Sequence, residues 1–145
     1  MRLHITLLLC ASLLSNAEAA DITWQKLTVN IDNIDAARGG VVALYLFLEE
    51  GFPTKHDMAL KSYQFEATST SHQLVIKVPV QPFALKAHHD DDRSGNVTKN
   101  WTDFIPAEGL AFSSGARLSF GPPSFKDAMM TVPSNQKTHL PMIYP

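Results

Sequence analysis

Hydrophobic and polar residues alternate through several short stretches of the chain, the pattern of β-strands with one buried face. The clearest case is 72–80, where Leu74, Ile76 and Val78 alternate with polar or exposed positions. The stretch 41–48 is apolar at almost every position and lies between glycine-containing turns, which predicts a central strand covered on both faces. The strands expected from these patterns cover 27–31, 41–48, 61–68, 72–80, 83–88, 110–112, 117–120 and 138–144, and 127–132 is either a strand or a helical turn.

These six to eight short strands are separated by turns, and no convincing amphipathic helix accompanies them. The pattern predicts an all-β chain folded as an antiparallel β-sandwich. Pro79 and Pro141 favour edge positions for their strands, because proline has no N–H to donate to a neighbouring strand. No regular element is expected from Asp90 to Gly109, and a loop of that length is usually functional or held in place by something.

The length of 145 residues suggests one domain, preceded by a short targeting segment. Residues 1–19 have a positive start at Arg2, an apolar stretch over 5–14 and a small-x-small cleavage site at Ala17-Glu18-Ala19. We therefore expect a signal peptide at 1–19 and a single β-sandwich domain at 20–145. The alternatives are a buried N-terminal helix or a membrane anchor, but the apolar stretch is shorter than the roughly 20 residues that span a bilayer.

The composition indicates the cellular location of the protein and excludes some classes of partner. The only cysteine, Cys10, lies within the expected signal peptide, so the mature chain has neither a disulfide nor a thiolate. An extracytoplasmic domain without disulfides points to a bacterial periplasmic or secreted protein. With 12 basic and 14 acidic residues and no basic patch, nucleic acid is not an expected partner, and no second apolar run predicts a membrane span.

The most acidic stretch of the chain has the spacing of a calcium loop. Asp90, Asp92 and Ser94 fall at loop positions one, three and five, and Gly95 falls at six, where the chain must turn sharply. Asn96 at position seven would contribute its backbone carbonyl. Calcium prefers six to eight oxygen ligands, and alternate residues of a tight loop supply them. The alternative is an acidic hairpin loop that is simply solvated.

The second half of the calcium pattern is incomplete. Thr98, at position nine, would act through a water, and Trp101 stands at position twelve in place of a bidentate glutamate. Asp103 and Glu108 are the candidates to complete the shell, although Glu108 would alternatively only accept backbone N–H bonds. We therefore expect a weak site, with a dissociation constant on the order of 0.1–1 mM.

Two pairs of residues near this loop have ordinary as well as functional interpretations. His88 and His89 are adjacent on a strand, so their side chains point to opposite faces and do not easily share one ion. Packing, or hydrogen bonding to the loop, is the ordinary role for one of them. Trp101 and Phe104 form either an exposed aromatic platform for a carbohydrate or peptide, or a hydrophobic plug on the end of the sandwich.

Several motifs in the second half of the chain carry a resemblance to a known family: His89-Asp90, Asp92, Ser94-Gly95, Ile105-Pro106-Ala107-Glu108-Gly109, Phe112-Ser113, Gly121-Pro122-Pro123-Ser124-Phe125 and Asp127-Ala128. With these residues in this order, the chain resembles the bacterial secreted proteins of the domain of unknown function 2141 family. The resemblance implies an immunoglobulin-like or prealbumin-like domain of about seven strands and no known activity. Thr98 stands where the family usually has aspartate, and Phe104 and Ala111 stand where it has glycines.

Three functions fit these observations. The first is a non-enzymatic periplasmic or secreted binding module for a protein or carbohydrate, with calcium ordering its long loop. The second is a metal-dependent hydrolase using Asp90, Asp92 and one of the adjacent histidines, His88 or His89. Convergence of His139 or His72 on the loop would support it. The chain has no Gly-x-Ser-x-Gly, no paired-histidine helix motif and no mature cysteine, which disfavours an enzyme. The third is a purely structural envelope protein.

Overall fold

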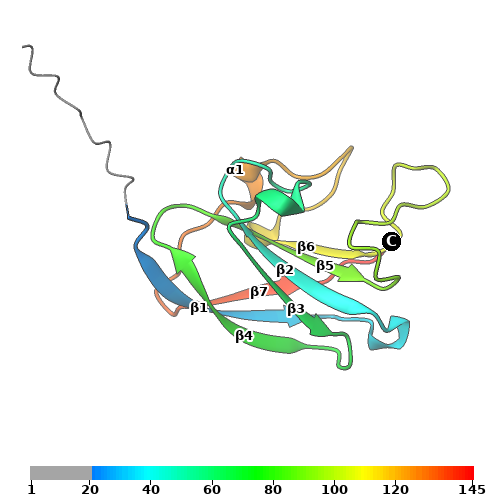
Figure 1. Ribbon diagram of the computed structural model, residues 1–145, viewed down its shortest axis with the longest axis horizontal. Coiled ribbons are helices and arrows are strands. Elements are labelled where there is room, and N and C mark those ends of the chain that lie inside the picture. The colour runs from blue at the N-terminus through cyan, green and yellow to red at the C-terminus, as the bar shows by residue number, and fades with distance from the viewer. Residues whose placement is uncertain (1–20) are drawn as a thin grey trace, which may run out of the picture.

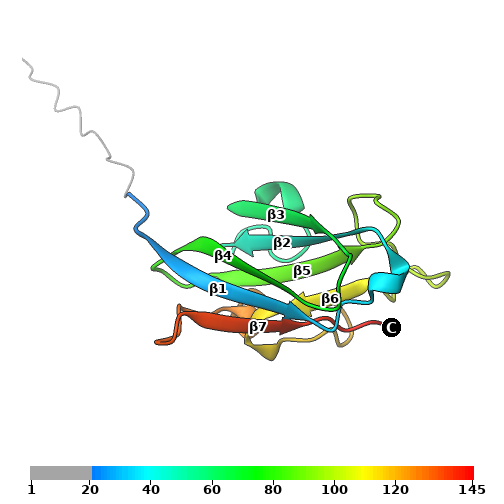
Figure 2. The same cartoon turned by 90° about the horizontal axis from the view of Figure 1, so that it is seen from below.

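The computed structural model describes residues 21–145 and places them in two β-sheets. One sheet has the strand order β3-β2-β5-β6, and the other has the order β4-β1-β7 (Figures 1 and 2). The long loop 91–108 projects from the end of the molecule where the C-terminus lies (Figure 1). The strands are β1 (Trp24–Asp32), β2 (Val41–Phe47), β3 (Lys61–Glu66), β4 (His72–Pro79), β5 (Ala84–Asp90), β6 (Gly109–Phe112) and β7 (Lys137–Pro141).

The arrangement confirms an all-β sandwich with seven strands among the described residues. Every neighbouring pair of strands is antiparallel except β1 and β7, which run parallel. Alternation of apolar residues reports which face of a strand is buried, but it carries no information on the direction of the partner strand. The sequence pattern therefore predicts the strands without predicting this parallel pair.

The facing sides of the two sheets enclose the main core. Six of the seven residues of β2 are buried, as expected for a central strand covered on both faces. The strands β4 and β7, which carry Pro79 and Pro141, are the two edges of the three-stranded sheet. The buried side chains of this core include Leu27, Val29, Ile31, Val42, Leu44, Leu46, Ile76, Val78, Leu85, Ala87, Ala111 and Leu140.

The other side of the four-stranded sheet, here called the outer face, is covered by loops and single helical turns. Its small apolar cluster consists of Ala84, Leu110, Phe112 and Ala128. The loop 51–58 and the loop 91–108 cover the same face through Phe52 and Val97. The turns of helix in the structure are η1 (Ala36–Arg38), η2 (His56–Met58), η3 (Ser113–Gly115) and α1 (Phe125–Ala128).

Two expectations for the last third of the chain need correction or refinement. The strand expected at 117–120 does not form, and that prediction was wrong: the segment is irregular, with Phe120 fully exposed. Its apolar residues line a pocket instead of pairing with a sheet. The segment 127–132 divides into the end of α1 and a single bridge from Met130 to Phe83.

Two further expectations concern the membrane and the N-terminus. Within residues 21–145, no helix has the length and apolar character needed to cross a membrane. The predicted signal peptide at 1–19 lies outside the described residues.

Candidate metal centre

The strand β5 carries buried polar side chains on its outer face. Successive strand residues point to opposite faces, so Lys86, His88 and Asp90 share the outer face while Leu85 and Ala87 enter the main core. The three polar residues are only 3 %, 0 % and 5 % exposed. Buried polar groups need hydrogen-bond or charge partners, and the surrounding loops must supply them here.

The loop after β5 closes on its own carboxylates. Both oxygens of Asp90 accept backbone N–H bonds, from Ser94 at 2.9 Å and from Gly95 at 2.8 Å. Asp92 accepts a bond from the Ser94 N–H at 2.9 Å and another from the Thr98 hydroxyl at 2.6 Å. Gly95 has a φ of 80°, so glycine suits the turn at the position expected from the spacing. Hydrogen bonds, led by that of Thr98, lower the pKa of Asp92 to about 2.

Glu108 reaches this loop from the residue just before β6. Its Oε2 accepts the Thr98 backbone N–H at 2.8 Å and the Nε2–H of His88 at 2.7 Å. Its other oxygen, Oε1, is buried and has no hydrogen-bond partner among the described residues. Glu108 is 2 % exposed, so this oxygen has no solvent to compensate it.

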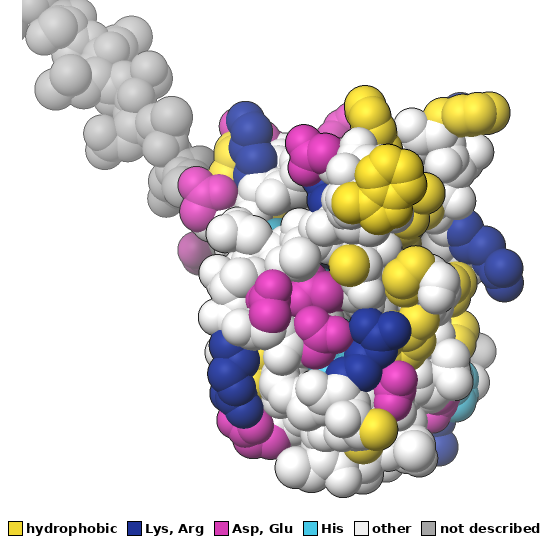
Figure 3. Space-filling view, turned by 90° about the vertical axis from the view of Figure 1, so that its right-hand side faces the viewer, with side chains coloured by type: hydrophobic (Ala, Val, Ile, Leu, Met, Phe, Trp, Pro, Cys, Tyr) yellow, Lys and Arg dark blue, Asp and Glu magenta, His cyan; other side chains and the backbone are white. Residues whose placement is uncertain are grey.

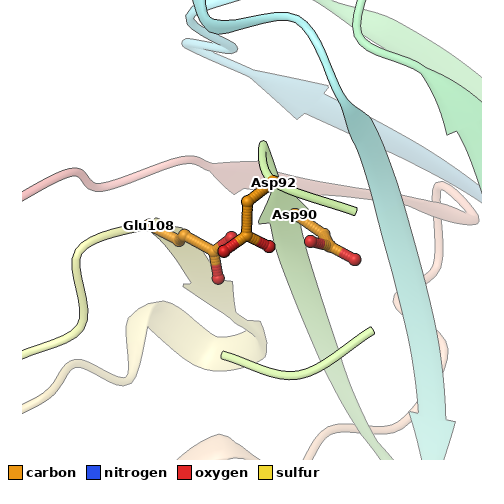
Figure 4. A group of neighbouring side chains, drawn as sticks. All are labelled: Asp90, Asp92 and Glu108. Atoms are coloured by element: carbon orange, nitrogen blue, oxygen red, sulfur yellow. The ribbon is translucent and has the colours of Figure 1, made fainter. Parts of the chain in front are cut away.

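The three carboxylates of Asp90, Asp92 and Glu108 converge from opposite ends of the long loop. Each offers one oxygen, and the three oxygens lie within 4.8 Å of one another. Figure 4 shows Asp92 between the other two side chains. Within residues 21–145, no lysine or arginine forms an ion pair with any of the three. The basic side chain in contact with the group is His88, at Glu108 Oε2. Such a group of carboxylate oxygens is chemically suited to a hard cation such as calcium.

The other residues predicted for the metal lie near this group or apart from it. The Ser94 hydroxyl donates to the Asn96 carbonyl at 2.9 Å, so these two loop residues bind each other. Asp103 does not belong to the carboxylate group and lines a neighbouring pocket beside Phe104. Of the two candidates to complete the shell, the structure therefore brings Glu108 into the group.

The two aromatic residues predicted for a ligand are at the surface. Trp101 is 94 % exposed and Phe104 is 87 % exposed, so neither forms a plug over the end of the sandwich. Thr98 is the residue whose role the loop spacing did not predict. Its N–H and hydroxyl connect Glu108 to Asp92, whereas a water-mediated ligand was the only role expected for it.

The adjacent histidines occupy opposite faces, as their spacing predicts. His88 binds Glu108 on the outer face, whereas His89 lies on the inner side. His89 Nδ1 accepts the Tyr144 hydroxyl at 2.7 Å, and its Nε2–H donates to the Gly39 carbonyl at 2.6 Å. His89 is thus fully hydrogen-bonded to the protein and has no free ring nitrogen for a metal.

The two histidines whose convergence on the loop would support a hydrolase lie elsewhere. His139 contacts Asp32 at 3.2 Å, and His72 stacks on Phe65 with ring centroids 3.7 Å apart. Neither belongs to the group of acidic residues around Glu108. The hydrolase hypothesis therefore gains no support from His139 or His72, and His88 is the histidine that contacts the group, through Glu108.

A second polar group lies further along the outer face. The Lys86 ammonium donates to the Pro53 carbonyl at 2.9 Å and to Nε2 of His56 at 2.7 Å. Burial lowers the pKa of Lys86 to about 8 and, with help from the Lys86 charge, lowers that of His56 to about 4. The His56 ring stacks on Tyr45 and lies 6.0 Å from the His88 ring, centroid to centroid. Sequence alternation placed Lys86 beside His88 but gave no signal that the ammonium would be buried.

Comparison with known proteins gives one match. A family model described as an uncharacterized protein conserved in bacteria (DUF2141) matches residues 29–140. No curated protein and no solved structure matches the chain. The matched range includes every strand that forms the outer face and the whole of the long loop.

Proposed function

Since the chain belongs to the DUF2141 family of bacterial proteins, we propose that it is an extracytoplasmic, non-enzymatic module that binds calcium at its long loop. The ion sits between Asp90, Asp92 and Glu108. It connects the turn after β5 to the start of β6. The expected signal peptide supports a periplasmic or secreted location, where free calcium reaches concentrations that a weak site can use.

The observation that carries this proposal is the buried Glu108 carboxylate. One of its oxygens has no hydrogen-bond partner, and it lies in a group of three carboxylates that no lysine or arginine of residues 21–145 neutralises. Asp92 is exposed, but the Asp90 and Glu108 carboxylates are buried, which is costly because water no longer solvates their charge. A divalent cation removes that cost.

Hydrogen bonds within the loop determine what the ion adds. The turn from Asp90 to Gly95 is already held by backbone N–H donors, so calcium is not needed to form it. Each oxygen of Asp90 and Asp92 accepts one hydrogen bond within the loop and retains a second lone pair for the ion. Glu108 Oε2 already accepts two bonds, so Oε1 is the Glu108 oxygen that remains open to the ion. Calcium therefore mainly fastens Glu108 and the returning strand to a turn that is already formed.

The direct test is a calorimetric titration of calcium into the purified, chelator-treated protein. We expect a single site with a dissociation constant of about 0.1–1 mM. At 10 mM calcium this affinity adds about 1.4–2.7 kcal/mol to the free energy of unfolding. Magnesium should bind more weakly, because it needs a compact octahedral set of ligands.

The matched variants are Glu108→Gln and Glu66→Gln. Glu108→Gln keeps the shape and the hydrogen-bond acceptor but removes the charge, and it should abolish the calcium heat. Glu66→Gln removes an exposed charge paired with Arg93 and should leave the affinity unchanged. Equal calcium affinity in wild-type protein and Glu108→Gln would refute the proposed site.

A further inference from the structure

A pocket of about 620 Å³ lies over the outer face, between the long loop and the irregular segment 118–122. Its volume falls in the range of roughly 300–1,000 Å³ that small-molecule sites occupy. The pocket is separate from the carboxylate group, because Asp90, Asp92 and Glu108 do not line it.

The walls of this pocket are apolar and unusually exposed. They are formed by Val97 and Phe104 on one side and by Leu118 and Phe120 on the other. The exposed fractions of Phe104 and Phe120 are 87 % and 110 %, so both rings stand in water in the free protein. Figure 3 shows hydrophobic side chains gathered on this end of the molecule. A concentration of exposed apolar surface around a pocket is typical of a binding site.

Lys86 lies at the inner end of this pocket, at the sheet. The residue is 3 % exposed, and its ammonium uses two of its three N–H donors, on the Pro53 carbonyl and on His56. No carboxylate within residues 21–145 forms an ion pair with it. The charged groups on the remaining lining, Lys99 and Asp103, are exposed and have opposite signs.

A buried ammonium without a counter-ion, at the inner end of an apolar pocket, favours one kind of occupant. An anionic head would take the remaining N–H donor and neutralise the charge, and charge-assisted bonds of this kind are the strong ones. An apolar body would cover the exposed aromatic walls and remove them from water. A neutral or cationic ligand would cover the apolar walls but would leave the Lys86 charge without a counter-ion.

We propose that this pocket binds a small organic anion with an apolar body, of the type of a medium-chain carboxylate. The carboxylate contacts the Lys86 ammonium, and the chain lies between Phe104 and Phe120. The site is independent of the calcium proposal, since it uses neither the metal-binding carboxylates nor the ion. It assigns the exposed loop aromatic Phe104 to a ligand that also contacts the sheet.

The test is a calorimetric titration of the purified protein at pH 7 with octanoate and, separately, with 1-octanol. The two probes share the same chain length and differ in the charge of the head. Octanoate should bind at least about tenfold more tightly than 1-octanol, as expected for a charge-assisted hydrogen bond at a buried site. Failure of octanoate to bind at millimolar concentration would overturn the proposal.

Three variants separate the head from the walls. Lys86→Met keeps the length and apolar stem of the side chain, and it should remove the preference for octanoate over 1-octanol. Lys77→Met changes an exposed lysine on the opposite sheet and should bind as wild type does. Phe120→Ser lies at a fully exposed position, so it should fold normally and weaken both probes to the same extent.

Two other outcomes would also overturn the proposal. Equal binding of both probes, unaffected by Lys86→Met, would mean that only the apolar walls act. The other outcome is a dimer in sedimentation analysis. If Phe120→Ser dissociates that dimer and octanoate does not, a second copy of the chain covers the pocket. Glu108→Gln separates the two proposals, since it should abolish calcium binding and leave octanoate binding intact.

Discussion

The two faces of the four-stranded sheet differ in what the same strands bury. On the inner face, Leu85 and Ala87 of β5 join an apolar core shared by both sheets. On the outer face, Lys86, His88 and Asp90 of the same strand are equally buried, yet loops and not a second sheet cover them. One strand therefore contributes apolar side chains to the core on one side and carries the residues of the two proposed binding sites on the other.

This difference shows where a small β domain can bury charged and polar side chains, whose burial costs free energy. A core between two sheets is filled by apolar side chains and leaves little space for charges. A face covered by loops brings backbone N–H groups, carbonyls and side-chain oxygens next to the buried polar residues. The outer face can therefore hold the Lys86 ammonium and a group of three carboxylates without disturbing the main core.

The largest effect on stability is expected from a change that disrupts the packing of the inner face. Leu85→Ala removes a fully buried side chain from the main core and leaves a cavity between the sheets. We expect a loss of about 2–5 kcal/mol in the free energy of unfolding. Urea denaturation measures it, and the denaturant slope should stay unchanged if the loss arises in the folded state. A loss below 1 kcal/mol would mean that β5 is less important to the core than its burial indicates.

The neighbouring change on the outer face should act in the opposite direction. Lys86→Met replaces a buried unpaired ammonium with an apolar group of similar length, and we expect a gain of about 1–3 kcal/mol at pH 7. In the wild type, the folded pKa of about 8 lies below the ordinary value of 10.5. The unfolded chain therefore binds more protons in that window, and wild-type stability should rise from pH 8 to about 10.5.

Denaturation of both proteins across this pH range isolates the contribution of Lys86. The difference in stability between Lys86→Met and the wild type should shrink as the pH rises, since the ammonium loses its proton. Burial raises the pKa values of Tyr45 and Tyr144. Both tyrosines are present in both proteins, so their contributions to the pH dependence of stability cancel in the difference. A difference that does not change with pH would show that the Lys86 ammonium is solvated in the folded protein.

Calcium should slow the opening of the long loop over the outer face. We expect it to slow hydrogen exchange at the Thr98 amide, which donates to Glu108, while leaving exchange at the Leu44 amide of β2 governed by global unfolding. Chelation should restore the original rate at Thr98. At 10 mM calcium the protection should correspond to about 1.4–2.7 kcal/mol. Exchange at Leu44 should slow as well, because global unfolding also releases the ion. An exchange rate at Thr98 that calcium does not change would contradict the proposed site.

The smallest effect is expected from breaking an exposed ion pair between β3 and the long loop. Glu66→Gln breaks the ion pair that connects β3 to Arg93 of the acidic loop, and both side chains are more than half exposed. Exposed ion pairs add little to stability and are screened by salt. We expect a drop in Tm smaller than for any change above, and one that disappears in 1 M sodium chloride (roughly a 3 Å screening length). A larger drop in Tm would show that this ion pair helps to hold the long loop in place.

Prediction from the sequence succeeded where a repeating pattern reports burial. The expected strands at 41–48 and 72–80 match β2 and β4 within one residue, because apolar alternation and flanking turn residues are local signals. The expected strand at 117–120 failed because its apolar residues line a pocket, and a short apolar pattern does not say what covers it. Pairing of β1 with β7 joins distant segments, so no local pattern encodes it.

For the candidate site, spacing along the chain was informative only within the turn. Asp90, Asp92 and the glycine that follows are close in sequence, so their convergence in the loop follows from loop geometry. The choice between Asp103 and Glu108 depended on where the returning strand begins. Only the pairing of β6 with β5 brings Glu108 beside His88 and Thr98.

By itself, the sequence determined a β domain, its buried strand faces and an acidic turn with a calcium-like spacing, because these depend on neighbours along the chain. The tertiary structure decided which carboxylate joins that turn and which lysine lies beneath the exposed aromatic residues. Those outcomes depend on strand pairing and on loops that fold back over a sheet. The physical reason is that burial and the partners of a charge are set by contacts in space, which composition and spacing do not contain.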